Sequence, residues 1–194
     1  DGVRHMSWVI ESAEDTSFIE GQFAAVPSLY IADGHHRSAA AERVWERRQG
    51  SGQSGLFLVV IFPHDQMQVL PYNRAVSDLN DHTPEELLMA LEKAFEVVTP
   101  GALEPAAKHE IGLYLDGQWR MLRVRPESID ETDPVAQLDV SLLQDHVLAP
   151  LLGIDDPRTS ERIRFVGGIR GTAELERLVD SGACACTFSM HPTG

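Results

Sequence analysis

The amino-acid sequence predicts a mixed α/β (α+β) fold, and three observations support this class. Short strand-like runs alternate with amphipathic helical patterns along the 194 residues, and no repeat or low-complexity tract interrupts them. The apolar fraction of 43% is sufficient for a packed core. No second β-α-β unit is regular enough to indicate a doubly wound parallel sheet.

The first 80 residues alternate between extended and helical patterns. Short apolar runs typical of strands cover residues 28–32 (SLYIA), 56–62 (LFLVVIF) and 67–76 (MQVLPYNRAV). Pro63 ends the second of these runs, and Pro71 marks the edge or the end of the third. Between the first two runs, an alanine-rich helix is expected over 38–49, ended by Gly50.

A helix start is expected at Thr83. Its hydroxyl can cap the helix, Pro84 suits the first turn, and Glu86 completes a capping box. Leu87 and Leu91 then fall on one face, which we expect to be buried.

The second half of the chain contains the clearest hairpin. Residues 111–124 read as two strands, because Asp116-Gly117 is a favoured two-residue turn. Further elements are expected as strands over 95–99, 163–166 and 183–190, and as helices over 138–153 and 172–182.

Charge and cysteine content narrow the classes of function. The formal net charge of −14 repels phosphate backbones, so we expect no nucleic-acid partner. The longest apolar run, near 55–62, is too short to span a bilayer, so we expect no membrane partner either. Cys184 and Cys186 are expected to be reduced structural cysteines, and the protein is expected to be cytoplasmic.

The residues that carry the most chemistry are Asp33-Gly34-His35-His36-Arg37, at the expected seam between a strand and a helix. A helix start presents unpaired N–H groups and a positive dipole, which together favour a phosphate. Gly34 permits a sharp turn and a close ligand, Arg37 can grip two oxygens, and His35 and His36 can donate hydrogen bonds. Asp33 can hold Mg²⁺ beside the phosphates, or orient a histidine or Arg37.

Simpler interpretations of the same residues stay open. Asp33 can serve only as the helix cap, one of the two histidines can be structural, and Arg37 can pair with an acidic neighbour. A metal site built on the histidine pair lacks the further spaced ligands it would need. Gly-x-Gly-x-x-Gly and Walker A patterns are absent.

The stretch YIADGHHRSAAA (30–41) resembles the signature of a family of uncharacterised bacterial and archaeal proteins, domain-of-unknown-function family 1015. A similar block precedes the signature at 1–10, and others follow it in the family's order at 69–76, 138–154 and 163–168. The resemblance implies a longer protein whose front portion is missing here. We expect residues 1–80 to belong to a phosphate-binding core and 81–194 to form a C-terminal α/β portion.

The Asp-Gly-His-His-Arg turn is also similar to that of the ParB/sulfiredoxin-like superfamily, which includes free-serine kinases. This resemblance implies a ParB/sulfiredoxin-like core and phosphoryl transfer from ATP, ADP or pyrophosphate, with Mg²⁺, to a small hydroxyl compound, L-serine being favoured. It assigns catalytic roles to Asp33, His35 and His36, and the metal to Asp33. It assigns phosphate binding to Gly34, His35, His36, Arg37 and Arg74.

Two departures from the family pattern leave alternatives open. The chain reads Tyr72-Asn73-Arg74 where the family has Thr-His-Arg, so Arg74 remains as a ligand for an acceptor carboxylate or for phosphate. The carboxylate base of the serine kinases lies ahead of their signature, and no acid here is singled out by spacing. A nucleotide-binding regulatory module without kinase activity is therefore the alternative function, and a degenerate scaffold is a third.

Overall fold

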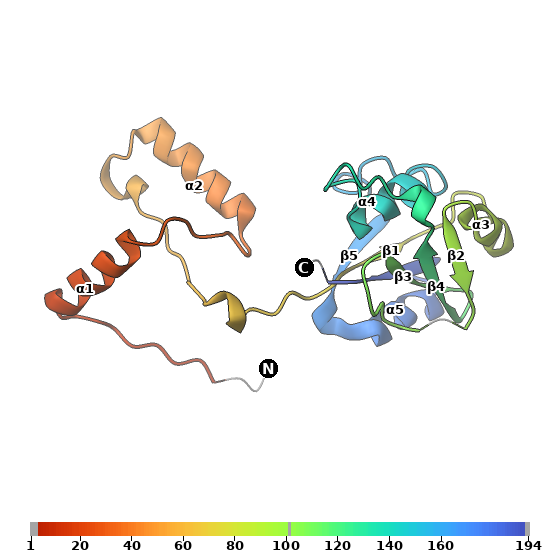
Figure 1. Cartoon of the computed structure of the whole chain (residues 1–194), viewed down its shortest axis with the longest axis horizontal. Coiled ribbons are helices and arrows are strands. Elements are labelled where there is room, and N and C mark those ends of the chain that lie inside the picture. The colour runs from red at the N-terminus through yellow and green to blue at the C-terminus, as the bar shows by residue number, and fades with distance from the viewer. Residues whose placement is uncertain (1–3, 101, 193–194) are drawn as a thin grey trace. The chain divides into compact units, whose positions relative to one another are not determined.

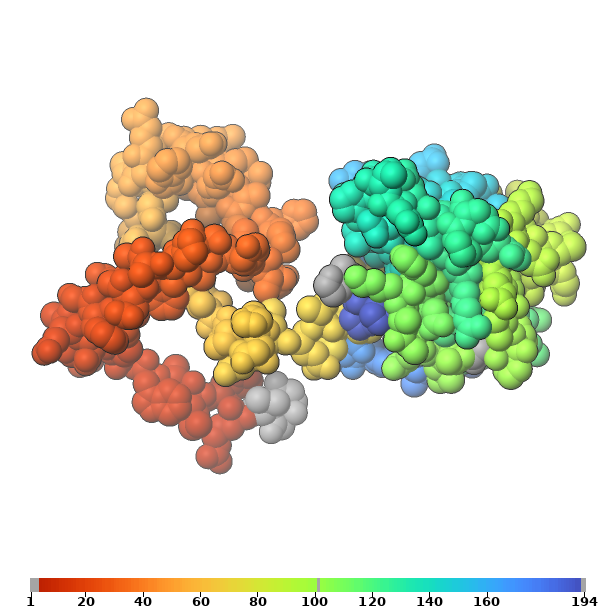
Figure 2. Space-filling view, in the orientation of Figure 1, coloured from red at the N-terminus to blue at the C-terminus, as the bar shows by residue number. Residues whose placement is uncertain are grey.

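The computed structural model describes residues 4–100 and 102–192 of the chain. It divides into two compact units, the first ending at Phe62 and the second beginning at Pro63 (Figure 1). Figure 2 shows the atoms of the second unit closely packed, whereas openings separate segments within the first.

The first unit contains two helices and a short 3₁₀ turn among its described residues. They are α1 (Ala13–Ala24), α2 (His35–Arg48) and η1 (Gly52–Gly55). Helix α1 was not expected from the sequence; the Ser12 hydroxyl caps it by accepting a hydrogen bond from the Asp15 N–H at 3.3 Å. Helix α2 confirms the alanine-rich helix but begins three residues earlier than expected, so that His35, His36 and Arg37 are helical.

The prediction of strands over 28–32 and 56–62 is wrong, because neither segment forms a strand in the structure. Both segments lack a β-ladder, and Tyr30 and Leu58 are 92% and 93% exposed. An extended run becomes a strand only when another strand accepts its backbone hydrogen bonds. Among the described residues of the first unit no such partner is present, and none of them is buried. The expected strand–turn–helix arrangement around Asp33 therefore has the helix without the strand.

The described residues of the second unit contain a six-stranded sheet with the order β2-β4-β3-β6-β1-β5. Its strands are β1 (Tyr72–Val76), β2 (Phe95–Val98), β3 (Glu110–Leu115), β4 (Gln118–Val124), β5 (Ile163–Gly167) and β6 (Cys186–Met190). Every neighbouring pair is antiparallel, which agrees with the mixed α/β class and with the lack of a doubly wound pattern. Of the run expected over 67–76, only the part from Tyr72 onwards is a strand.

The helices of the second unit are α3 (Pro84–Leu91), α4 (Asp139–Leu143) and α5 (Gly171–Asp180), with a π-helical turn, η4 (Gln144–Leu148), directly after α4. Short 3₁₀ turns occur at η2 (His64–Gln66), η3 (Pro126–Ser128) and η5 (Gly168–Arg170). The capping box at the start of α3 is confirmed: the Glu86 N–H donates to the Thr83 hydroxyl at 3.2 Å, and the Thr83 N–H donates to the Glu86 carboxylate at 2.8 Å.

The expected hairpin is formed by β3 and β4. Asp116 and Gly117 have φ angles of 51° and 70°, the left-handed pair of values that a type I′ turn requires. The ladder runs from Leu115 opposite Gln118 to Glu110 opposite Arg123.

Buried side chains of the described residues form two groups, one on each face of the sheet. The larger group includes Val76, Phe188 and Ile111 from the strands and packs against α3, α4 and η4. The smaller group includes Ala75 and Tyr114 and packs against α5 (Figure 1). Because side chains alternate along a strand, the side chain of residue 74 lies on the same face as Val76, beneath α4.

Cys184 and Cys186 are both free and buried, as expected for structural thiols. Burial raises the pKa of the Cys186 thiol well above its usual value, so the thiolate is suppressed. Within the part of the chain that the structure describes, no helix is both long and apolar enough to cross a membrane.

The capping box yields a stability prediction. Replacing Thr83 by Ala removes the acceptor for the Glu86 N–H and should lower the free energy of unfolding of the second unit by about 1 kcal/mol. Thr83→Ser keeps the hydroxyl and should cost less than half as much. Urea denaturation followed by circular dichroism measures both; equal stability of the Ala variant and the original protein would contradict the assignment.

Candidate functional site

The five residues from Asp33 to Arg37 form the entry to helix α2. Gly34 is the N-cap residue, with φ of 83°, and its carbonyl accepts the first helical hydrogen bond from the Ser38 N–H at 2.9 Å. A left-handed backbone conformation at this position suits glycine, because other side chains strain there. His35, His36 and Arg37 form the first helical turn, and the side chains of all three are exposed.

The first turn of α2 has no side-chain cap. Gly34 has no side chain, and the turn contains no acidic residue, so its N–H groups face no negative charge from within the helix. This arrangement excludes the simpler interpretation of Asp33 as the helix cap. Unpaired N–H groups and the positive end of the dipole leave a position suited to an anion.

Asp33 and Arg37 pair with each other across this turn. The Arg37 Nη2 donates to the Asp33 Oδ2 at 3.1 Å, and the two side chains are 75% and 93% exposed. An ion pair this exposed contributes about 0–1 kcal/mol, so it can open when a stronger anionic ligand binds Arg37. The pairing confirms the simpler interpretation in which Arg37 pairs with an acidic neighbour, and it is also compatible with a role for Asp33 in orienting Arg37.

The turn offers the expected Mg²⁺ a single carboxylate, that of Asp33. Among the described residues no group of three or more His, Cys, Asp or Glu side chains is arranged to hold a metal ion. Mg²⁺ is commonly held by one or two carboxylates together with the oxygens of a substrate's phosphates. Asp33 fits a metal that arrives with a phosphate ligand, and it does not form a metal site by itself.

Arg74, the fifth predicted phosphate ligand, belongs to the second unit and is 9% exposed. Its guanidinium carbon lies 4.5 Å from the centre of the Phe165 ring and 5.3 Å from that of Tyr72. Its Nη1 donates to the Tyr72 carbonyl, and no carboxylate among the described residues forms an ion pair with it. Burial lowers the pKa of Arg74 to about 10, so the side chain still carries its charge at neutral pH.

Asn73, which stands where the related family has histidine, has a structural role. Its side chain is buried, and its Oδ1 accepts a hydrogen bond from the Met190 N–H at 2.9 Å. The amide thus joins β1 to the end of β6, beyond the residues paired through their backbones. In this chain, position 73 holds two strands together and leaves Arg74 as the charged residue of the element.

An open cavity of about 410 Å³ adjoins Arg74. Asp133 reaches it from the loop before α4, and Ser141, Gln144 and Asp145 reach it from α4 and η4. Volumes from about 300 Å³ upwards are typical of small-molecule sites. Arg74 is the basic residue among the described side chains that line this cavity.

The helix that lines the cavity is locally widened at Gln144. The Ala149 N–H donates to the Gln144 carbonyl at 3.0 Å, a spacing of five residues. Such π-helical turns occur frequently at functional sites. The sequence pattern predicts one continuous helix over 138–153, so this widening is a departure from the expectation.

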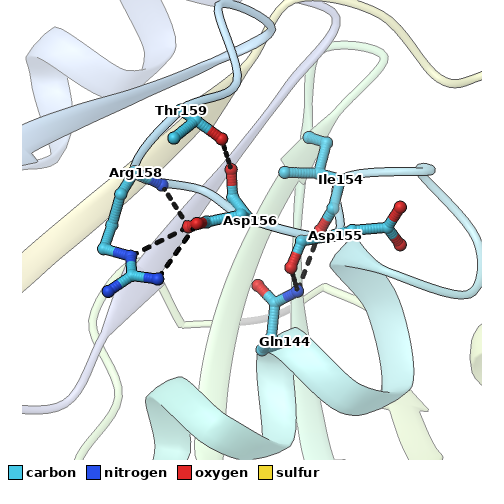
Figure 3. Close-up of polar contacts among 6 residues, drawn as sticks. All are labelled: Gln144, Ile154, Asp155, Asp156, Arg158 and Thr159. Atoms are coloured by element: carbon cyan, nitrogen blue, oxygen red, sulfur yellow. Dashed lines mark hydrogen bonds and ion pairs between the residues drawn. The ribbon is translucent and has the colours of Figure 1, made fainter.

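The side chain of Gln144 is fixed at one end and unpaired at the other. Its Nε2 donates to the carbonyls of Ile154 and Asp155 at 2.8 and 3.1 Å (Figure 3). Its Oε1 is buried and has no hydrogen-bond partner among the described residues. A buried acceptor without a donor is costly, so this oxygen would gain from a ligand or a water that donates to it.

The loop after Ile154 is held in place by its own polar contacts. Both Nε and Nη2 of Arg158 donate to the Asp156 carboxylate at 3.0 Å, and the Thr159 hydroxyl donates to the Asp156 carbonyl (Figure 3). Hydrogen bonds from Arg158 hold the pKa of Asp156 below its usual value. The loop therefore supplies fixed carbonyls to Gln144.

Of these polar residues around the cavity, the sequence singled out Arg74 as a candidate ligand and did not single out Ser141, Gln144 and Asp145. The helical pattern over 138–153 indicates which residues face the core, and it gives no sign that the adjacent polar positions meet Arg74. Their one available signal was position, since Ser141, Gln144 and Asp145 recur at the three- and four-residue spacing of a single helix face.

Gly34 provides a test of the geometry at the start of α2. A Cβ at this position would lie 3.1 Å from the Arg37 Nη2 and would occupy a backbone with φ of 83°. We expect Gly34→Ala to destabilise the helix start by about 1 kcal/mol and to displace Arg37. Amide hydrogen exchange over 35–38 should become faster, whereas exchange at the other end of α2 should not change. Unaltered protection over 35–38 would contradict this geometry.

Comparison with known proteins gives one result that bears on identity. The family model described as Protein of unknown function (DUF1015) matches residues 1–141. Comparison with curated proteins found no match, and comparison with solved structures found none either. Because the matched residues make up most of the chain, the protein belongs to the DUF1015 family.

Proposed function

We propose that the protein is a phosphotransferase that moves a phosphoryl group from a nucleotide or pyrophosphate to a small hydroxyl compound, with L-serine favoured. One observation carries the proposal: the first turn of α2 presents uncapped N–H groups beside an exposed guanidinium and two exposed imidazoles. Resemblance of Asp33–Arg37 to the turn of the ParB/sulfiredoxin-like superfamily supports the same reaction class and a related core.

Each residue of the turn has a role in this proposal. The N–H groups after Gly34 bind phosphate oxygens, and Arg37 exchanges its exposed pairing with Asp33 for the donor's phosphates. His35 and His36 donate hydrogen bonds to oxygens that gain charge during transfer. In the transfer, the acceptor oxygen bonds the phosphorus and gives its proton to water, while the bond from the phosphorus to the leaving phosphate of the donor breaks. The site promotes this step through positioning and charge neutralisation.

Asp33, released from Arg37, holds the metal that accompanies the donor. Mg²⁺, when bound, neutralises charge on the phosphates and fixes their orientation. The net charge of −14 supports small-molecule partners over nucleic acids, and we propose a cytoplasmic protein.

Phosphoserine formation tests the reaction. The whole chain is mixed with Mg²⁺, L-serine and, in turn, ATP, ADP or pyrophosphate, and the product is sought by mass spectrometry. Phosphoserine is expected with one or more of these donors. If no donor yields phosphoserine while a nucleotide still binds, the enzyme proposal is wrong and a regulatory nucleotide-binding module takes its place.

Arg37→Ala tests the phosphate-binding turn itself. Loss of a charge-assisted contact should weaken binding of the donor by roughly tenfold to a hundredfold in calorimetry. Arg47→Ala is the matched control, because it removes the same charge from the last turn of the same helix. Equal donor affinity of the two variants would contradict the role of Arg37.

A further inference from the structure

We propose that the cavity beside Arg74 binds a small α-amino acid in its zwitterionic form. In this arrangement Arg74 receives the α-carboxylate, and Asp145 receives the α-ammonium group. No sequence pattern assigned Ser141, Gln144 or Asp145 to a site, and the inference depends on their juxtaposition with Arg74 around one cavity.

The first step of the argument is the charge of Arg74. Arg74 as a residue is 9% exposed, so its side chain has lost much of its contact with water. Among the described residues no carboxylate forms an ion pair with it. Contacts with the rings of Phe165 and Tyr72 compensate part of this loss. A carboxylate from outside would provide the paired, two-pronged hydrogen bonding that a guanidinium favours.

The second step is the negative charge on the other side of the cavity. Asp133 and Asp145 both line it, which disfavours a polyphosphate and favours a ligand that also carries a positive group. The Asp133 Oδ1 already accepts hydrogen bonds from the N–H groups of Val135 and Ala136, at 2.7 and 3.2 Å. Among the described residues, the Asp145 carboxylate accepts no hydrogen bond of this kind, and the residue is exposed.

The third step is the fixed position of the Gln144 side chain. Its amide nitrogen is committed to the carbonyls of Ile154 and Asp155, so the side chain forms a fixed part of the cavity wall. The neighbouring Asp145 is the group that meets the ammonium, whose three donors suit a carboxylate.

The remaining wall fits the rest of a small amino acid. Val140 and Leu148 provide apolar contact, and the Ser141 hydroxyl can both donate to and accept from a polar side chain. The inference concerns the second unit by itself and goes beyond the proposed function. Binding of the amino acid itself does not require phosphoryl transfer.

Calorimetry on the whole chain, without any phosphoryl donor, tests the site. The probes are L-serine, its decarboxylated analogue ethanolamine and its deaminated analogue 3-hydroxypropionate. L-Serine should bind at least tenfold more tightly than either analogue, because each lacks one of the two charges. No measurable binding of L-serine or glycine up to millimolar concentrations would overturn the proposal, as would equal affinity for serine and ethanolamine.

Two variants assign the charges. Arg74→Gln should weaken L-serine binding at least tenfold and leave the weak binding of ethanolamine unchanged. Asp145→Asn should weaken L-serine and ethanolamine and leave 3-hydroxypropionate unchanged. Arg120→Gln is the matched control for Arg74, since Arg120 is equally buried at 9% and donates to the Leu115 carbonyl away from the cavity lining.

Circular dichroism checks that each variant folds. If Arg74→Gln does not fold, Arg74→Lys is used in its place to test the role of Arg74. Lysine keeps the charge without the planar fork, so L-serine binding should be intermediate between that of Arg74→Gln and that of the original protein. Serine binding unchanged in a folded variant at position 74 would overturn the assignment.

Failure of this inference can be distinguished from failure of the proposed function. If L-serine binds with the expected variant pattern but no donor yields phosphoserine, the cavity is an amino-acid site and the phosphotransferase is wrong. If phosphoserine forms while L-serine binding lacks the expected variant pattern, the reaction stands and the cavity beside Arg74 is not an amino-acid site.

Discussion

The alternation of side chains along β1 and β6 determines how the second unit is built. Both strands lie in the interior of the sheet, so each must present residues to two covered faces. Val76 and Phe188 go to the face beneath α4, and Ala75 goes to the face covered by α5. A strand that places Val76 in the larger core must place Arg74 on the same face, two residues earlier, and so a cation is set at the border of an apolar layer.

The two regions of interest hold their arginines under opposite physical conditions. Arg37 is on the surface, paired weakly with Asp33, and its charge is available at little cost. Arg74 has lost much of its contact with water, and among the described residues two aromatic rings and one carbonyl compensate part of this loss. The exposed charge of Arg37 suits a strongly hydrated polyphosphate that arrives with a metal. The partly desolvated charge of Arg74 favours a ligand whose charged groups each meet a group of opposite charge in the cavity.

Elements whose signals lie within a few neighbouring residues were predicted correctly from the sequence, whereas elements that depend on distant parts of the chain were not. Thr83 and the Asp116-Gly117 turn act within four residues, so their patterns identified a helix start and a hairpin. The runs at 28–32 and 56–62 have strand-like composition, but a strand also requires a partner, which composition does not specify. Gln144 lies 70 positions from Arg74, and only the folded sheet and the π-helical turn bring the two to one cavity.

Burial of the Arg74 guanidinium without a carboxylate partner among the described residues also links the supply of a ligand to the stability of the folded state. The desolvation of Arg74 raises the free energy of the native protein, and any anion that pairs with it returns part of that cost. By mass action, a ligand present at a hundred times its Kd stabilises the native state by about 2.7 kcal/mol. If a metabolite occupies the cavity as proposed, its supply would change the abundance of this protein in a cell, where unfolded chains are removed by proteases.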